Sequence, residues 1–419
     1  MRVLKGMMYL LLMIQFTLAN AELSIEIIGA GENQMPVAIV PFGGDHKLAQ
    51  AIYDVVAGDL QRSGLFRLVD TGGKLPHELS EVNYPDWQGR GAEALAIGTV
   101  ANAENNVIEA RFRLLDVVRQ VELVGQAVSA SSTQIRAIGH RISDMIYEKL
   151  TGDKGVFSTR IAYVNRVDGR YTLVVADSDG YNEQIVLSQK QPIMSPAWSP
   201  DGGHLAYVSF ETDHAVVFVQ SLYTNQRILL AGFSGSNSAP SWSPDGKQLA
   251  IVMTRDGSSL IYLVHPDGSN LRQISFGNVI DTEPNFSPDG QYLLFTSDRG
   301  GSPQIYRMPV SGGAAQRVTF SEGAGYSPRH SPDGKGFAFN YRVNGKFYIA
   351  TQDFQTGQME VLTAGGWEKK PSFAPNGKMI LFASEARGRG ILATVSSDGR
   401  VQRHMFTQNG DAREPVWGP

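Results

Sequence analysis

A five-residue phrase recurs at a nearly constant interval through the C-terminal part of the chain, and this repeat constrains the fold more than any other feature. One copy reads Trp198-Ser199-Pro200-Asp201-Gly202, matching phrases begin at Trp242, Phe286, His330 and Phe373, and a shortened copy begins at Trp417. The steps between these starts are 44, 44, 44, 43 and 44 residues. A period of about 40 to 45 residues is typical of propeller blades and of helical arrays.

The content of one repeat favours strands over helices. In the copy at Trp242, Pro244-Asp245-Gly246 suits a tight turn, because Pro and Asp fit its middle and Gly its positive-φ exit. Two short apolar runs follow, at 249–253 and 260–264, and then a last short strand at 271–274, with Gly-containing turns between them. Together with the segment before Trp242 they make four hairpin-linked strands, which is one propeller blade.

The shortened last copy predicts that the propeller closes into a ring. Residues 160–164 match 204–208, and Ile161 lies 44 residues before Leu205, so this upstream segment keeps the phase of the repeat. We expect the C-terminal strand at Trp417 to pair with residues 159–190, because closure removes sheet edges that would otherwise be open. The prediction is an all-β, six-bladed β-propeller over residues 153–419.

Residues 22–152 predict a separate α/β (α+β) domain. Asp45 suits the N-cap of a helix that ends at Gly64, and Ser131 opens a last helix with Gln134 as a capping box and Gly152 as its end. The other expected elements are strands at 22–28, 36–42 and 66–69, a second helix within 87–98, and an antiparallel pair at 108–115 and 121–128.

Residues 1–21 have the pattern of a secretory signal peptide. Basic Arg2 and Lys5 precede a mostly apolar stretch at 7–18, and Ala19-Asn20-Ala21 is a small-residue cleavage site before Glu22. We therefore expect an exported protein without direct membrane insertion. The chain has no cysteine, which excludes disulfides and cysteine nucleophiles. A net charge of −4 without a basic block makes nucleic acid an unexpected partner.

The sequence contains no motif for catalysis, a metal or a cofactor, and we expect none of these. The repeated aspartates, such as Asp245, are expected to cap turns. Two alternatives stay open. A propeller enzyme would need paired carboxylates, for which Glu283 and Glu414 are the candidates, with Lys369, Lys370 and Arg413 able to neutralise them. A glycan-binding propeller would present aromatic side chains such as Tyr326.

The repeats differ most just before each phrase, where the first strand of each blade begins. First strands line the axis of a propeller, so these segments should converge around one mouth of the channel, and variable loops on a repeated frame are where binding specificity usually lies. The candidate binding residues are Met194, Ser195, Ser236, Asn237, Ala239, Asp281, Thr282, Glu283, Tyr326, Lys369, Arg413 and Glu414.

The chain as a whole resembles the TolB family, the periplasmic component of the Tol–Pal system of Gram-negative bacteria. The resemblance depends on the repeats together with residues 147–152, 159–164, 179–182 and 194–202, in this order after the N-terminal domain. It implies a non-enzymatic adaptor that supports outer-membrane integrity and constriction during cell division. It further implies that the channel mouth receives the lipoprotein Pal and that colicins and outer-membrane proteins are additional partners.

By position, the resemblance places Ala239, Thr282 and Glu283 in Pal-binding loops, while Ser236 stands where relatives can have His. It also implies that the mature N-terminus binds the C-terminal domain of TolA. The residues concerned are Glu22, Leu23, Ser24, Ile25, Glu26, Ile27 and Ile28. Their alternating pattern fits strand addition to a partner's sheet; the alternative is an edge strand of the first domain. We expect a monomer.

Overall fold

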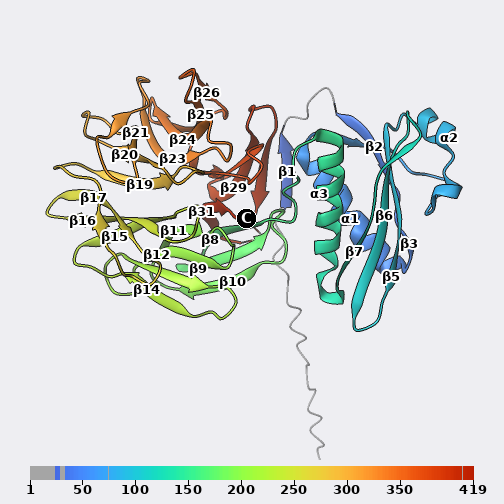
Figure 1. Cartoon of the computed structure of the whole chain (residues 1–419), viewed down its shortest axis with the longest axis horizontal. Helices are drawn as coiled ribbons and strands as arrows, with labels where there is room; N and C mark the ends of the chain where they lie inside the picture. Colours follow the sequence, from blue (N-terminus) through green and yellow to red (C-terminus); the bar gives the residue numbers. More distant parts are fainter. Residues whose placement is uncertain (1–23, 29–33, 74, 408) are drawn as a thin grey trace, which may run out of the picture.

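The computed structural model describes residues 24–28, 34–73, 75–407 and 409–419, which form an N-terminal α/β domain beside a six-bladed β-propeller (Figure 1). The predicted fold class is confirmed. The predicted signal peptide, residues 1–21, lies outside the described residues, as do Glu22 and Leu23. Within the described ranges, no helix is long and apolar enough to cross a membrane.

The N-terminal domain is built on one mixed sheet with the strand order β4-β2-β5-β6-β7. Strand β2 pairs in parallel with β4 and β5, whereas β5, β6 and β7 form an antiparallel meander. The strands are β2 (Met35–Ile39), β3 (Gly43–Gly44), β4 (Phe66–Leu68), β5 (Ala94–Asn102), β6 (Val107–Asp116) and β7 (Val121–Ser131). The helices are α1 (His46–Ser63), α2 (Tyr84–Gly89) and α3 (Ile135–Thr151), with short 3₁₀ turns at Leu79–Glu81 and Ser132–Gln134.

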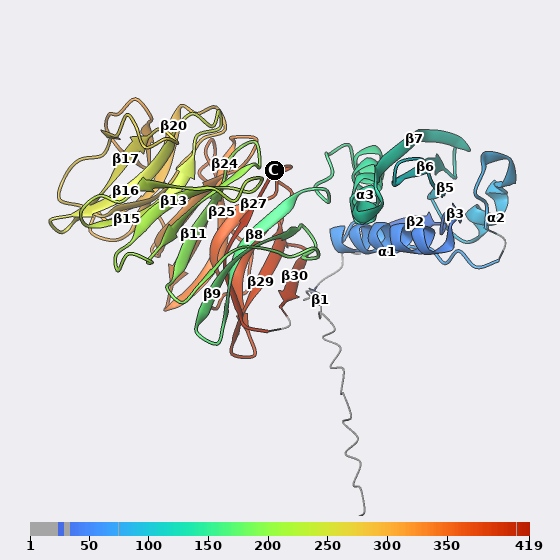
Figure 2. The same ribbon diagram turned by 90° about the horizontal axis from the view of Figure 1, so that it is seen from below.

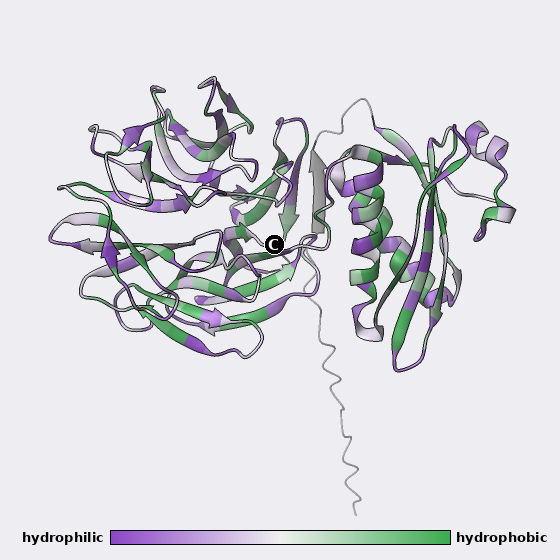
Figure 3. Cartoon of the chain, viewed as in Figure 1, coloured by the Kyte–Doolittle hydropathy of each residue, from purple (hydrophilic) through white to green (hydrophobic). Residues whose placement is uncertain are grey.

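Each face of this sheet has its own hydrophobic core. Helices α1 and α3 pack on one face, where Ile52, Ile142 and Phe112 are buried, and α3 lies on the side toward the propeller (Figure 1). On the other face, Trp87 of α2 packs with Leu95 and other residues of β5 and β6. Hydrophobic residues run along the strands of both domains and along α1 and α3 (Figure 3).

The predicted limits of α1 are confirmed by its caps. The Asp45 side chain accepts hydrogen bonds from the backbone N–H groups of Lys47 and Leu48, and Gly64 ends the helix at φ 73°. Gly152 ends α3 in the same way, at φ 81°. At the start of α3, however, the Ser131 hydroxyl accepts only from Thr133, within a 3₁₀ turn, and the helix proper begins at Ile135.

The prediction of a second helix within 87–98 is wrong. The helix α2 ends at Gly89, and residues from Ala94 onward form β5. Strand β5 lies in the middle of the sheet and is buried on both faces, so its apolar residues are nearly continuous. A continuous apolar run does not distinguish a buried strand from a buried helix.

Blades 1 to 5 each contain four sequential strands, as the repeat predicts. Blade 1 contains β11 (Ile193–Trp198), β12 (His204–Ser209), β13 (Val216–Ser221) and β14 (Arg227–Ala231). Blade 2 contains β15 (Ser236–Trp242), β16 (Leu249–Arg255), β17 (Ser258–Val264) and β18 (Arg272–Gln273). Blade 3 contains β19 (Asp281–Phe286), β20 (Tyr292–Ser297), β21 (Gln304–Pro309) and β22 (Gln316–Arg317). Blade 4 contains β23 (Ala324–His330), β24 (Gly336–Val343), β25 (Lys346–Asp353) and β26 (Met359–Val361). Blade 5 contains β27 (Lys369–Phe373), β28 (Met379–Ala386), β29 (Arg389–Ser396) and β30 (Gln402–Phe406).

Blade 6 joins the two ends of the propeller sequence. It consists of β31 (Asp411–Trp417), β8 (Arg160–Val167), β9 (Arg170–Asp177) and β10 (Gln184–Gln189). Strand β31 pairs antiparallel with β8, with Trp417 opposite Ile161. The Trp417 indole also donates a hydrogen bond to the Thr159 hydroxyl at 2.8 Å. The last strand of the chain is therefore the innermost strand of a blade that begins more than 200 residues earlier.

The repeated aspartates cap turns, as predicted. Asp245 accepts hydrogen bonds from the Ser243 hydroxyl and from the backbone N–H of Lys247. Asn376 takes the same place in blade 5 and accepts from the Lys378 N–H. These side chains are satisfied within their own turns, so they hold the repeat together and do not form a catalytic set.

The N-terminal strand β1 (Ser24–Ile28) belongs to the propeller, not to the first domain. It pairs antiparallel with the outer strand β30 of blade 5, with Ser24 opposite Phe406 and Ile28 opposite Gln402, and Figure 2 shows the two strands together. The alternative that this segment is an edge strand of the first domain is therefore wrong for residues 24–28. The alternating pattern predicts a strand, but it does not specify which open sheet edge receives the strand.

Candidate protein-binding site at the channel mouth

The innermost strands of all six blades carry the same irregularity near the channel axis. In each, the register with the second strand shifts next to a residue that precedes proline and has a positive φ, between 48° and 57°. We call these six residues the bulge ring: Ser195, Ala239, Glu283, Ser327, Lys370 and Glu414. The prolines that follow them recur with the repeat period and are the sequence signal that could have revealed the ring.

The bulges direct polar groups of one blade toward the next. A bulge re-aims a side chain and interrupts the ladder of backbone hydrogen bonds. The Ser195 N–H donates to Glu414 Oε2 at 3.0 Å, and the Ser327 N–H donates to Glu283 Oε2 at 2.9 Å. Left-handed backbone at non-glycine residues is unfavourable and clusters at functional sites, where the surrounding structure maintains it.

Inside the mouth, all six innermost strands line one cavity of about 250 Å³. Its charged side chains are Glu283, Lys370 and Arg329. Lys370 Nζ lies 2.6 Å from Glu283 Oε1 and 3.8 Å from Glu414 Oε2, and all three side chains are about four-fifths buried. Of the three cations named as able to neutralise this carboxylate pair, Lys370 does so directly.

Glu283 stays ionised at neutral pH. Burial alone would raise its pKa, but the charge and hydrogen bond of Lys370, with help from the Ser327 hydroxyl, lower the pKa to about 2. A general acid needs a pKa near the working pH, and this carboxyl group has the opposite shift. The geometry thus argues against Glu283 as the acid of a glycosidase pair and favours a fixed ion pair.

The other two predicted cations lie against aromatic rings on the rim. Lys369 Nζ is 4.2 Å from the centroid of Trp367 and 4.7 Å from that of Phe347, and the Arg413 guanidinium carbon is 4.7 Å from Trp367. Tyr326 packs on Phe347 at 6.1 Å. We call these five residues the cation–aromatic rim. Trp367 and Phe347 were missed because they lie outside the repeat phrase, although Trp367 is the one propeller tryptophan out of phase with it.

Exposed apolar side chains also occur in the segments that form or precede the first strands of three blades. They are Met194, Ile280, Phe276 and Phe320, with 40%, 49%, 69% and 75% of their surfaces exposed. Met194 is in the first strand of blade 1, and the others lie in the loops that lead into blades 3 and 4. Exposed apolar groups beside charged ones are typical of protein-binding surfaces.

Two of the predicted binding residues are buried instead of exposed. The Asn237 amide donates to the backbone oxygens of Ala215 and Phe233, and Asp281 forms an ion pair with Arg299 at 2.6 Å. Both hold the loops of their blades in place. A side chain without exposed surface cannot be recognised directly, so their effect on a partner would be indirect.

The mouth and the N-terminal domain are at opposite ends of the propeller. First strands run from the bulge ring to the Pro-Asp/Asn-Gly turns, and the first domain contacts the turn end. There the Arg403 guanidinium donates to the Gln61 carbonyl of α1 at 3.0 Å. In the segment that joins the two domains, Asp153 pairs with Lys378 at 2.9 Å, and the Lys154 carbonyl accepts from the Asn376 amide. Among the described residues, these contacts lie at the turn end of the propeller, opposite the bulge ring.

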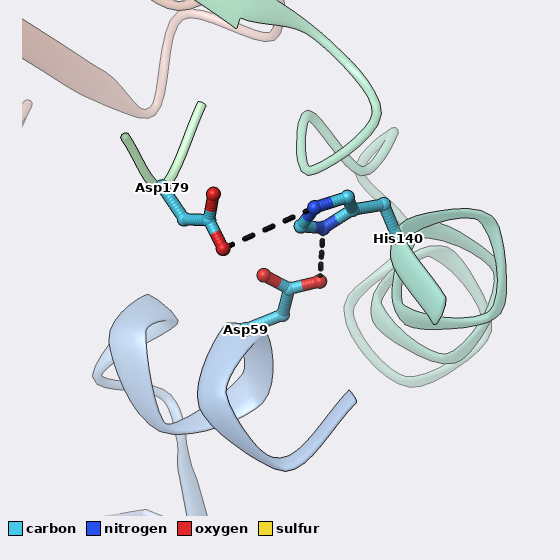
Figure 4. Close-up of side chains that lie close together, drawn as sticks. All are labelled: Asp59, His140 and Asp179. Carbon is cyan, nitrogen blue, oxygen red and sulfur yellow. Dashed lines mark hydrogen bonds and ion pairs between the residues drawn. The ribbon is translucent and has the colours of Figure 1, made fainter. Parts of the chain in front are cut away.

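A second buried charged cluster lies between the domains, where Asp59, His140 and Asp179 come together (Figure 4). His140 Nδ1 is 2.7 Å from Asp59. The set has donor atoms that could hold a metal, but Arg62 ion-pairs with both aspartates and Arg136 with Asp179. These two guanidinium groups occupy the carboxylates that a cation would need. The cluster is an ion-pair network that joins α1 and α3 to blade 6.

The network predicts a pH dependence of stability. Burial alone would lower the pKa of His140, but Asp177 and Asp59 raise it to about 9, from 6.5. Because the folded state holds the His140 proton more tightly than the unfolded state does, protonated His140 contributes about 3 kcal/mol to the free energy of unfolding. This contribution is fully present below pH 6.5 and is lost as the pH rises through 9. We expect the free energy of unfolding, measured with urea from pH 6 to 9.5, to fall over this interval. His140→Gln should remove that slope; identical slopes in both proteins would contradict the assignment.

Comparisons with known proteins agree with this architecture. A family model described as the TolB amino-terminal domain matches residues 23–123, and one described as the TolB beta propeller domain matches residues 147–419. The chain is 60% identical over 410 residues to the Tol-Pal system protein TolB of Nitrosomonas europaea, covering 98% of this chain and 96% of the relative. It is 62% identical over 402 residues to that of Dechloromonas aromatica, covering 96% and 94%.

A solved structure extends the agreement to the whole fold. The crystal structure of TolB from Acinetobacter baumannii superposes with a TM-score of 0.89 at 38% identity, covering 95% of this chain and 100% of that one. Both domains are thus matched in sequence and in three dimensions. The chain belongs to the TolB family and is a non-enzymatic component of the Tol–Pal system.

Proposed function

We propose that the protein is a periplasmic adaptor that binds the lipoprotein Pal at the channel mouth and the C-terminal domain of TolA through its mature N-terminal strand. In this role it supports outer-membrane integrity and constriction during cell division. The observation that carries the proposal is the mouth itself, where the bulge ring, the cation–aromatic rim and exposed apolar side chains converge away from the first domain.

The chemistry of the mouth supports a protein partner. Its centre contains a nearly neutralised set of buried charges, and its rim offers large apolar and aromatic groups beside Lys369 and Arg413. Aromatic residues and arginine are enriched where protein interfaces have their strongest contacts. A partner loop that enters the mouth would meet Thr282 and Ala239 on the way to Glu283.

The structure of β1 supports a separate site for TolA. This strand adds to the outer edge of blade 5 through backbone pairing with β30. The hydrogen bonds that β1 makes with β30 could be replaced by equivalent backbone hydrogen bonds with the edge of another sheet. Peptides that bind by strand addition form this kind of pairing. Pal and TolA would then bind at different places on the molecule.

Substitution of Thr282 tests the Pal site. Thr282 is half-buried in β19 beside Glu283, and Thr282→Arg would add a long cation to a mouth that already contains Lys370 and Arg329. We expect calorimetric titration with the soluble domain of the cognate Pal to show binding weakened by about tenfold or more. Thr224→Arg is the matched control, since Thr224 is exposed in a turn at the other end of the propeller. Equal affinities of the two variants would move the site away from the mouth.

A further inference from the structure

A second cavity, of about 580 Å³, lies between the two domains. Its walls come from the end of α1, from α3 and the following segment, and from the turn end of blade 5. Much of the wall is apolar, including Tyr147, Val156, Met379, Val401 and Met405. Cavities of this size at a domain interface, mostly apolar with a few polar groups, are where small ligands usually bind.

The charges of this cavity are not balanced. Among the described residues that line it, four are cationic and two are acidic. Lys378 pairs with Asp153, and Arg400 lies 3.6 Å from Asp398. Arg62, the third cation, is neutralised by Asp59 and Asp179, which stand behind the wall.

Arg403 is the remaining cation, and it has no carboxylate partner among the described residues. It is only 3% exposed. One guanidinium nitrogen, Nη2, donates to the Gln61 carbonyl at the end of α1, at 3.0 Å, but the buried Nε has no hydrogen-bond partner. Burial and the nearby charge of Arg62 lower the pKa of Arg403 to about 9.

The Gln61 carbonyl does not account for this arrangement. A cation near the C-terminal end of a helix is favourable, and the contact satisfies one nitrogen. It leaves a full positive charge buried beside a second arginine, with no carboxylate partner in the described part of the chain. An unpaired buried charge is among the most unfavourable features of a folded protein. Such a charge is explained by a ligand that supplies the missing anion.

We propose that this inter-domain cavity binds a small amphipathic carboxylate, with its anionic head on Arg403 and its hydrocarbon part against the apolar wall. The planar guanidinium group suits the geometry of a carboxylate. The wall around Met379 and Met405 suits an unbranched chain, because methionine side chains adapt to the shape of what they contact. The site is at the turn end of blade 5, at the other end of the propeller from the proposed Pal site, although Trp417 lines both cavities.

The test is a thermal-shift and calorimetric titration of the purified protein with octanoate. We expect saturable binding that raises the melting temperature. In contrast, 1-octanol tests for filling of the cavity by an apolar chain alone, and sodium sulfate tests for an anion alone; both should have much smaller effects. A response to octanol equal to that of octanoate, or no saturable response to octanoate, would overturn the proposal.

Two arginine variants make the test specific. Arg403→Met keeps an unbranched side chain but removes the charge, and it should weaken octanoate binding about tenfold or more. Because it removes an unpaired charge, it should also melt at the same or a higher temperature without ligand. Arg400→Met is the matched control, since Arg400 lines the same cavity from its exposed edge, and it should bind octanoate as the unmodified protein does. An Arg403→Met protein that is less stable but binds octanoate normally would show that Arg403 only caps α1.

Discussion

Replacing Glu283 with alanine is expected to lower the free energy of unfolding by about 3 kcal/mol and to weaken binding of the Pal soluble domain at least tenfold, or by about 1.4 kcal/mol or more. The variant leaves the largely buried Lys370 without its closest partner. It also removes the acceptor of the Ser327 hydroxyl and one of the two acceptors of the Ser327 N–H. Urea denaturation measures the first effect and calorimetric titration with Pal the second.

A double variant separates stability from recognition. In Glu283→Ala/Lys370→Met the unpaired charge is gone, so stability should return toward that of the unmodified protein, because a buried ion pair can be replaced by apolar groups at little cost. Pal binding should stay weak, since the mouth has lost its central charges. Recovery of both properties would mean that Glu283 acts on Pal only through the stability of blade 3.

Deleting residues 22–28 is expected to abolish binding of the TolA C-terminal domain while Pal affinity changes less than about twofold. The deletion removes β1, whose backbone pairs with β30 on the outer edge of blade 5, and it leaves the six innermost strands of the channel untouched. Loss of a whole added strand removes every backbone hydrogen bond that the segment could offer to a partner sheet. Pull-down or calorimetry with each partner measures the two affinities.

Point variants within the strand give the matched control. Glu26→Pro removes one backbone N–H, so the strand cannot form one of its hydrogen bonds to a partner sheet, and it should weaken TolA binding. Glu26→Ala keeps the backbone N–H and should have a smaller effect. If the deleted protein folds but loses Pal binding as well, the two partners do not have separate sites.

The propeller could be predicted from the sequence because its determinants are local and repeated. Each Pro-Asp/Asn-Gly turn fixes a hairpin by the conformations its own residues allow, and the period sets the length of a blade. The helix caps at Asp45 and Gly64 were predictable for the same reason. Strand β5 was not, since burial of both its faces removes the periodicity that separates strand from helix.

The candidate site could be predicted in outline only. Repeat phase places the variable segments at one mouth, but it does not say that Asn237 and Asp281 turn inward while Lys370 turns to Glu283. Trp367 and Phe347 reach the rim from a loop and a hairpin, outside the repeat phrase.

The sequence by itself determined the number of blades, the closure of the ring, and the alternating polar and apolar residues that predict a strand at β1. These features follow from turn chemistry and periodicity along the chain. Only the tertiary structure decided which sheet edge receives β1 and which cations neutralise which carboxylates in the channel. It also decided that Arg403 is buried with no carboxylate partner among the residues that the structure describes. Those outcomes depend on contacts between residues far apart in the chain, and side-chain pairing across such distances has no signal in local sequence pattern.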